Sequence, residues 1–316
     1  MPEACTECYC LVGPTATGKS AVAHFLAEAG GHEIVSADSM QVYAGMDIGT
    51  AKPTAEERSR VRYHMLDVVE PDRPYSAGAY RQDAGAAMAE ARRRGREAIV
   101  TGGTGLYVKA LTEGLHPQAP VDLDRRARWE SLYRQEGVPG LQQALRQRAP
   151  AIWAALADRR NPRRLIRALE RAQTEADAPP ATWRVPSSAP ALVGVTRSVR
   201  ELNRRIETRV DGMYRQGLLE ESRQLAARFP VFSRTARHAI GYAEALACLA
   251  GRLTVAQAKE RTAARTRQLA KRQRTWFRTQ MNVVWVTLDA EMQVDEAAGA
   301  VARAWARLGR TPVAPA

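Results

Sequence analysis

The chain of 316 residues has no apolar run of transmembrane length, and its N-terminus lacks the basic start and apolar stretch of a signal peptide. It also has few cysteines: Cys5, Cys8, Cys10 and Cys248. The spacing of Cys5 and Cys8 is that of a zinc knuckle, but no second Cys or His pair answers it, and Cys10 falls in an apolar run typical of a buried strand. We therefore expect a cytoplasmic, reduced protein with no membrane segment and no zinc site.

Acidic residues are in short supply. The chain has 34 Asp and Glu against 47 Lys and Arg, a formal net charge of +13. The bias of a GC-rich genome would explain why Arg replaces Lys, but it would not explain the excess of bases over acids. A polyanionic partner, most simply a nucleic acid, is the expected consequence. There are no internal repeats.

A phosphate-binding motif stands near the start of the sequence. It consists of Gly13, Pro14, Thr15, Ala16, Thr17, Gly18, Lys19 and Ser20, between an apolar run at 9–12 and an Ala-rich helical run. The glycines allow a sharp turn that brings backbone N–H groups to one anion, Lys19 adds a charge, and Ser20 offers a hydroxyl to Mg²⁺. The alternative is a Gly- and Thr-rich surface turn, and the flanking strand and helix argue against it. The motif predicts a site for a di- or triphosphate.

Short apolar strands alternate with amphipathic helices in the rest of the N-terminal third. Strands are expected at 33–36, 66–69 and 98–101, and again at 191–195 and 283–286. Ser76 is placed to cap a helix that runs to about Arg94, and a second glycine-rich turn at 102–105 opens another helix at Leu106. This alternation indicates an α/β fold with a mostly parallel sheet flanked by helices, of the P-loop NTPase kind.

The segment between about 117 and 190 has a different character. Strands disappear there, and Arg-rich helices are separated by Pro and Gly. We interpret 117–190 as an all-helical insertion domain, and 1–116 together with 191–316 as the catalytic core. One stripe of the insertion holds Arg160, Arg164, Arg167 and Arg171, with leucines on another side.

A second basic stripe lies on a helix near the C-terminus. Residues 259–278 hold eight bases and one acid, and Arg267, Lys271, Arg274 and Arg278 share a face. One such stripe is usually a solvated surface. Two stripes with few compensating acids, in a chain this basic, favour contact with a phosphate backbone.

Asp38 is the strongest acidic candidate. It follows the strand at 33–36, at the ligand-binding edge of an open parallel sheet and therefore beside the phosphate loop. A carboxylate there would hold Mg²⁺ or accept a proton from an acceptor, and a solvated loop residue or a helix cap is the alternative.

Several long segments together resemble one family, the tRNA dimethylallyltransferases. These are the phosphate loop at 13–20, SADSMQVY at 36–43, GMDIGTAK at 45–52, GGTGLY at 102–107 and TRQLAKRQ at 266–273. The resemblance implies transfer of a dimethylallyl group from dimethylallyl diphosphate to N6 of the adenosine at tRNA position 37, with Mg²⁺ as cofactor and the tRNA anticodon stem-loop as partner. It also suggests a monomer.

The resemblance implies roles for particular residues. Asp38 is the general base, and Lys19, Thr104 and Arg209 complete the catalytic set. Arg205 joins the phosphate loop in binding the diphosphate, and Ser20 holds the metal. The residues implied to contact tRNA are Asp38, Ser39, Met40, Gln41, Thr104, Arg163, Arg164, Arg167, His238, Gly241, Tyr242, Arg267, Gln268, Lys271, Arg272 and Gln273. The chain departs from many relatives at Arg163, where Gln is usual, and at Ala44, where Arg is common.

Three other functions fit part of the pattern. An adenylate isopentenyltransferase would use a free nucleotide, but it would need neither the insertion nor two basic stripes. A small-molecule kinase with a phosphate loop is usually shorter and less basic. A non-enzymatic RNA-binding protein would not need Lys19, Ser20 and Asp38 intact.

Overall fold

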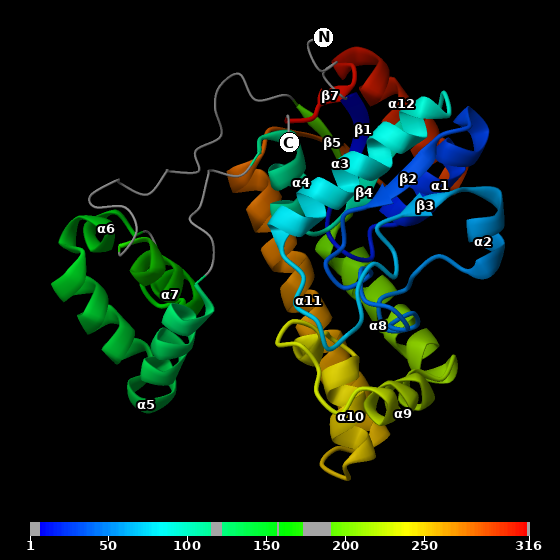
Figure 1. Ribbon diagram of the computed structural model, residues 1–316. Coiled ribbons are helices and arrows are strands. Elements are labelled where there is room, and N and C mark those ends of the chain that lie inside the picture. Colours follow the sequence, from blue (N-terminus) through cyan, green and yellow to red (C-terminus); the bar gives the residue numbers. More distant parts are fainter. Residues whose placement is uncertain (1–6, 115–121, 157, 173–190, 315–316) are drawn as a thin grey trace. The chain divides into compact units, whose positions relative to one another are not determined.

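The computed structural model describes residues 7–114, 122–156, 158–172 and 191–314 (Figure 1). The chain divides into two compact units, one made of 1–114 and 185–316 and the other of 115–184. The boundaries expected from the sequence, after residues 116 and 190, fall at the edges of the described residues or outside them.

A parallel sheet forms the centre of the larger unit. Its strands are β1 (Glu7–Val12), β2 (Glu33–Ser36), β3 (Tyr63–His64), β4 (Ala98–Gly102), β5 (Leu192–Thr196) and β6 (Val283–Thr287), in the order β3-β2-β4-β1-β5-β6. The short β7 (Thr311–Pro312) pairs antiparallel with β1. Val12, the last residue of β1, lies opposite Gly102 of β4 and Gly194 of β5, so the phosphate loop leaves the middle of the sheet.

Helices cover both faces of this sheet because its central strands are apolar on both sides. On one face, Leu11 packs with α1 (Lys19–Gly30) and α12 (Val294–Leu308). On the other, Cys10 and Val12 pack with α3 (Ala77–Arg93) and α4 (Gly105–Thr112). This α/β architecture, visible in Figure 1, is the expected one, and Ser76 caps α3 by accepting from the Ala79 N–H at 3.1 Å.

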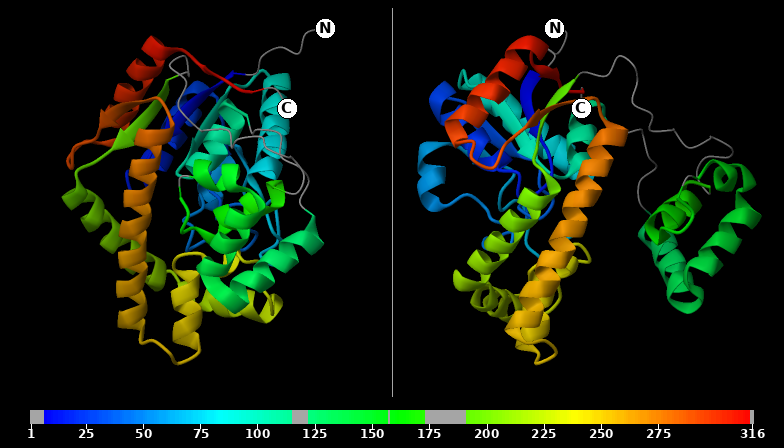
Figure 2. Two further views of the ribbon diagram at one scale, coloured as in Figure 1. Left: turned by 90° about the vertical axis from the view of Figure 1, so that its left-hand side faces the viewer. Right: turned by 180° about the vertical axis from the view of Figure 1, so that it is seen from behind.

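Further helices extend beyond the sheet. These are α8 (Val199–Arg215), α9 (Leu218–Arg228), α10 (Tyr242–Leu249) and α11 (Val255–Gln280), with the 3₁₀ turn η1 (Ala236–His238) before α10. Figure 2 shows α8 and α11 side by side, with α9 and α10 packed near their far ends. The α8 helix follows β5 directly, which brings its first turns to the phosphate loop.

The strand expected at 66–69 is wrong. The third strand is β3, Tyr63–His64, next to the short helix α2 (Ala55–Arg60), and the chain then turns. Met65 and Asp67 have φ angles of 64° and 56°, in the left-handed region, so the segment cannot stay extended. Only Val69 makes a bridge, to Tyr43. The Asp67 carboxylate instead accepts hydrogen bonds from Lys52 and Arg58.

The described elements of the smaller unit are all helices. It contains α5 (Leu123–Arg148), α6 (Pro150–Ala155) and α7 (Pro162–Arg171), and its core includes Leu141, Leu145, Leu165 and Leu169. The α5 helix breaks at Gly137, where φ is 67°. In the part of the chain that the structure describes, no helix is long and apolar enough to cross a membrane.

Candidate active site

The phosphate loop has the tight conformation that its glycines allow. At Gly13, with φ of 148°, a Cβ atom would lie 2.4 Å from the Val195 carbonyl oxygen, so only glycine fits. Gly18, with φ of 95°, precedes α1, whose N-terminal end therefore adjoins the loop. Ala16 has φ of 66°, a left-handed conformation that is strained for a residue with a side chain.

Three arginines bind this loop from outside. Arg197 Nε donates to the Thr17 carbonyl and Arg205 Nε to the Ala16 carbonyl, both at 2.9 Å. Arg209 Nη1 donates to Thr15 Oγ1 at 3.3 Å. Arg205 was predicted to bind the diphosphate and Arg209 to belong to the catalytic set, and these roles stay predictions. Sequence reasoning did not predict their contacts with the loop, and it missed Arg197. Arg197 lies just before α8, and its local sequence carries no signal of a contact with a loop 180 residues away.

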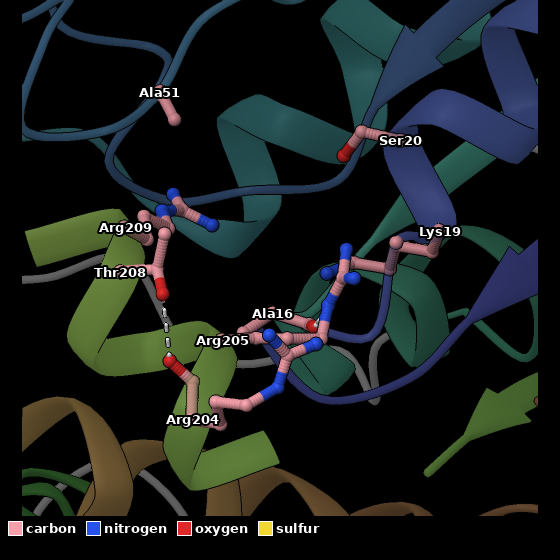
Figure 3. Close-up of a pocket in the computed structure, with 9 residues that line it drawn as sticks. Ala16, Lys19, Ser20, Ala51, Arg204, Arg205, Thr208 and Arg209 are labelled. Carbon is pink, nitrogen blue, oxygen red and sulfur yellow. Dashed lines mark hydrogen bonds between the residues drawn. The ribbon is translucent and has the colours of Figure 1, made fainter. Parts of the chain in front are cut away.

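A cationic cavity of about 390 Å³ opens beside the loop (Figure 3). It is lined by Ala16, Gly18, Lys19, Ser20, Ala51, Arg204, Arg205, Thr208 and Arg209. As Figure 3 shows, the arginines project from α8, and Lys19 and Ser20 come from the start of α1. None of the described residues in this lining is acidic, so the cavity suits an anion.

A second cavity, of about 100 Å³, adjoins the first. The two share Lys19, Ser20, Ala51 and Arg209 as lining residues, and the second adds Asp38. Lys19 and Arg209 therefore lie between the cationic cavity and the carboxylate. The structure brings Asp38 and the phosphate loop to one site, although they come from different strands.

The electrostatics of this wall follow from burial. Lys19 is 9 % exposed, and its Nζ donates to the Pro14 carbonyl at 3.2 Å. Burial lowers the pKa of Lys19 to about 8, with Asp38 opposing the shift and Arg209 adding to it. Burial also lowers the pKa of Arg209, again opposed by Asp38. A diphosphate bound beside them would stabilise the charged forms of both side chains.

The loop that carries Asp38 is tied to the second glycine-rich turn. Asp38 Oδ1 accepts from the Met40 N–H at 2.9 Å, and Thr104 Oγ1 accepts from the Ser39 N–H at 2.9 Å. Thr104 Oγ1 in turn donates to Ser39 Oγ at 3.2 Å. At Gly102 a Cβ would lie 2.2 Å from the Ala37 carbonyl oxygen, so the turn approaches this loop as closely as backbone can. Asp38 is thereby held at a fixed place on the sheet edge.

Two of the predicted tRNA contacts around residue 240 are buried. Gly241 and Tyr242 lie inside the larger unit, and the Tyr242 side chain is 3 % exposed. The Tyr242 hydroxyl accepts from the Gly49 N–H at 3.1 Å and donates to Glu221. His238 is exposed, and its carbonyl oxygen accepts from Arg265.

The predicted contacts on α11 divide into two groups. Gln268, Lys271 and Arg272 are exposed to solvent. Arg267 forms an ion pair with Glu207 at 3.3 Å, and Gln273 turns inward to the phosphate loop. A stripe counted from the sequence cannot separate these two groups, because the partners come from α8 and from the loop after β1.

The predicted arginines of the smaller unit also differ. Arg163 and Arg164 are exposed in the first turn of α7, whose cap is Asn161. Arg167 forms an ion pair at 2.8 Å with Glu170, which also accepts from Arg126. Among these three, Arg163 and Arg164 are the more accessible to a partner.

The metal expectations can be compared with the side chains present. Within the described ranges, no three His, Cys, Asp or Glu side chains gather as a metal site. Cys8 and Cys10 are buried, and Cys5 lies outside the described residues. Mg²⁺ at a phosphate loop is usually held by few protein groups together with substrate phosphates. The exposed Ser20 hydroxyl beside the cationic cavity fits that mode of binding.

Comparisons with known proteins show the family of the chain. The sequence model of the IPP transferase family matches residues 41–280. The chain is 42% identical to a tRNA dimethylallyltransferase of Geobacter metallireducens, covering 87% of this chain and 90% of the relative. It is 44% identical to a tRNA dimethylallyltransferase of Anaeromyxobacter dehalogenans, covering 87% of this chain and 93% of the relative.

Solved structures show the same fold. The crystal structure of a tRNA isopentenylpyrophosphate transferase from Bacillus halodurans is 34% identical, covers 94% of this chain and 97% of its own, and has a TM-score of 0.66. A eukaryotic dimethylallyltransferase acting on tRNA, at 24% identity, covers 95% of this chain and 77% of its own with a TM-score of 0.77, which supports the fold alone. The chain belongs to the IPP transferase family.

Proposed function

We propose that this chain transfers a dimethylallyl group from dimethylallyl diphosphate to N6 of the adenosine at position 37 of tRNA, releasing diphosphate. One observation carries the proposal. A cationic cavity on the phosphate loop adjoins a cavity lined by Asp38, and Lys19 and Arg209 belong to both. The leaving group and the proton acceptor therefore have separate places with a charged wall between them.

The diphosphate occupies the cationic cavity in this proposal. As the bond between the allylic carbon and the diphosphate oxygen breaks, negative charge grows on that oxygen. Lys19, Arg205 and Arg209 line the cavity and stabilise the charge. Ser20 would hold Mg²⁺, which would add Lewis-acid stabilisation of the departing diphosphate when bound.

Asp38 serves the acceptor. The N6 amine of adenine is a poor nucleophile because its lone pair is delocalised into the ring. As the new C–N bond forms, N6 loses a proton, and the Asp38 carboxylate accepts it. The Met40 N–H and the Thr104–Ser39 hydrogen bonds keep the carboxylate in place. The adenosine must leave its base stack to reach this sheet edge.

The basic surfaces supply the RNA contacts. Lys271 and Arg272 on α11, and Arg163 and Arg164 on α7, are exposed cations suited to the phosphates of an anticodon stem-loop. This assignment follows the charge excess of the chain, +13 over its full length. We propose that a single chain carries out the reaction.

The test uses two labelled donors. The protein is incubated with Mg²⁺ and either allyl-labelled dimethylallyl diphosphate or γ-labelled ATP, in each case with tRNA, with AMP, or with no acceptor. Label on tRNA from the prenyl donor alone supports the proposal. Label on AMP but not on tRNA would assign the chain to free-nucleotide prenylation, and transfer of label from ATP would assign it to the kinases. Either result overturns the proposal.

A further inference from the structure

Gln273 on α11 is in direct contact with the phosphate loop. Its Oε1 accepts a hydrogen bond from the Thr15 N–H at 2.8 Å, across 258 residues of sequence. The neighbours Lys271 and Arg272 are exposed, whereas Gln273 is only partly accessible. The side chain therefore contacts the phosphate loop from a helix whose exposed face is basic.

The contact lies next to the strained point of the loop. Ala16 has φ of 66°, and the backbone on either side of its Cα atom is held by a different side chain. Gln273 binds the N–H of Thr15 before it, and Arg205 Nε binds the carbonyl of Ala16 itself at 2.9 Å. A residue with a side chain stays in the left-handed region only where surrounding bonds require it. The hydrogen bond from the Thr15 N–H to Gln273 is one of those interactions.

Glycines allow α11 to come this close. At Gly103 a Cβ would lie 2.3 Å from Gln273 Nε2, and at Gly105 a Cβ would lie 2.0 Å from the ring of Trp276. Successive turns of α11 thus pack directly on the second glycine-rich turn, which also carries Thr104. The packing fixes the direction in which the Gln273 amide points.

We propose that Gln273 is a positioning residue for the diphosphate: it keeps the turn at Thr15 and Ala16 in the form that binds the anion, and it does not contact RNA. The proposal rests on the proposed function for the identity of the anion. The effect passes through one neighbouring residue. The Thr15 hydroxyl accepts a hydrogen bond from the Arg209 guanidinium, and Arg209 lines both cavities. A loop that relaxes at Ala16 moves the point to which Arg209 binds.

The first test replaces Gln273 by Leu, which keeps most of the volume and removes the acceptor, with Gln273→Met as a second variant in case the first does not fold. We expect the Kd for inorganic diphosphate with Mg²⁺, measured by calorimetry, and the KM for dimethylallyl diphosphate to rise about tenfold, the size of one lost hydrogen bond. The Kd for an anticodon stem-loop should stay the same. Weaker RNA binding with unchanged diphosphate binding would overturn the proposal, and so would no change in either.

A second substitution tests the mechanism. Glycine adopts the left-handed conformation without the penalty that alanine has. Ala16→Gly in the Gln273→Leu background should therefore recover most of the diphosphate affinity. No recovery would show that Gln273 does not act through this turn. Thr275→Ala is the matched control, because Thr275 is exposed on the same helix and should leave both affinities unchanged.

The diphosphate assay needs no turnover, so it separates the two proposals. If the wild-type protein does not transfer the prenyl group, but Gln273→Leu still weakens diphosphate binding, then the proposed function fails and the role of Gln273 stands. If prenyl transfer occurs and the variant binds diphosphate normally, the role of Gln273 fails alone.

Discussion

The Tyr242 hydroxyl donates a hydrogen bond to the Glu221 carboxylate, and this pair holds the loop that borders the active site. The Gly49 N–H donates to Tyr242, and the N–H of Ile48 donates to Glu221 at 3.0 Å. The same loop supplies Ala51, which lines both cavities. A tyrosine in a segment implied to bind tRNA is thus a buried support for the site wall.

Tyr242→Phe should lower the free energy of unfolding. The variant leaves the Gly49 N–H and the Glu221 carboxylate without their shared partner, which costs about 1–3 kcal/mol. Urea unfolding followed by circular dichroism measures the change. Tyr9→Phe is the control, because no hydrogen bond of the Tyr9 hydroxyl occurs among the described residues and its ring packs on Trp305. Equal stabilities of the two variants would contradict the supporting role.

Lys19 gives the site a pH dependence. Its pKa of about 8 in the folded protein lies below the ordinary value of 10.5, mainly because of burial. The unfolded chain therefore keeps this proton between about pH 8 and 10.5 while the folded chain has lost it, so the contribution of Lys19 to stability improves as pH rises through this window. At pH 7 the buried charge is unfavourable, by at most about 3 kcal/mol.

Two measurements follow from that sign. Lys19→Met should raise the free energy of unfolding at pH 7, and the gain should shrink toward pH 10. Diphosphate affinity of the wild type should fall above about pH 8, as Lys19 loses its charge. Lys259→Met is the control, because Lys259 is paired with Asp211 on the surface. It should neither raise the free energy of unfolding at pH 7 nor change the pH dependence of diphosphate affinity. Diphosphate affinity that stays constant up to pH 9.5 or so would contradict the assignment of the charged form as the binding form.

The sequence predicted the parts of the site that are continuous in the chain. The phosphate loop, Asp38 at a strand end and the turn at 102–105 each carry a local signal, and the sheet brings them to one edge. The strand at 66–69 was wrong because two residues there adopt left-handed conformations that neither side chain announces. Propensity describes a segment alone, whereas Asp67 is placed by its ion pairs with Lys52 and Arg58.

Contacts between distant segments were beyond the reach of sequence patterns. Arg197 donates to the Thr17 carbonyl, and only the fold brings these two residues together. Similarly, the basic stripe on α11 predicts a charged face, but it does not show that Arg267 is paired with Glu207 or that Gln273 points inward. Helical spacing gives the direction of a side chain on its own helix, and the packing of other elements decides what it meets.

Asp38→Asn should abolish most turnover and leave tRNA binding intact. The amide oxygen of Asn can still accept from the Met40 N–H, so the loop keeps its conformation, while the proton acceptor is lost. We expect a decrease in kcat of about 10²- to 10⁴-fold, the usual contribution of a general base. Single-turnover prenylation of tRNA measures the rate, and filter binding measures tRNA affinity. A decrease in tRNA affinity equal to the loss of rate would point to a binding role for Asp38.

Reversing the charges of Lys271 and Arg272 to Glu should weaken tRNA binding and flatten its salt dependence. Both side chains are exposed on α11, and they adjoin Gln273 in the sequence, which contacts the phosphate loop. Each phosphate contact that is lost lowers the slope of log K against log salt by about 1, so the double variant should lower it by about 2. The matched control reverses Arg303 and Arg307 on α12, which are also exposed but lie on a helix that covers the other face of the sheet from α3 and α4. If both double variants change the slope equally, net charge alone governs tRNA binding, and α11 has no special place in the interface.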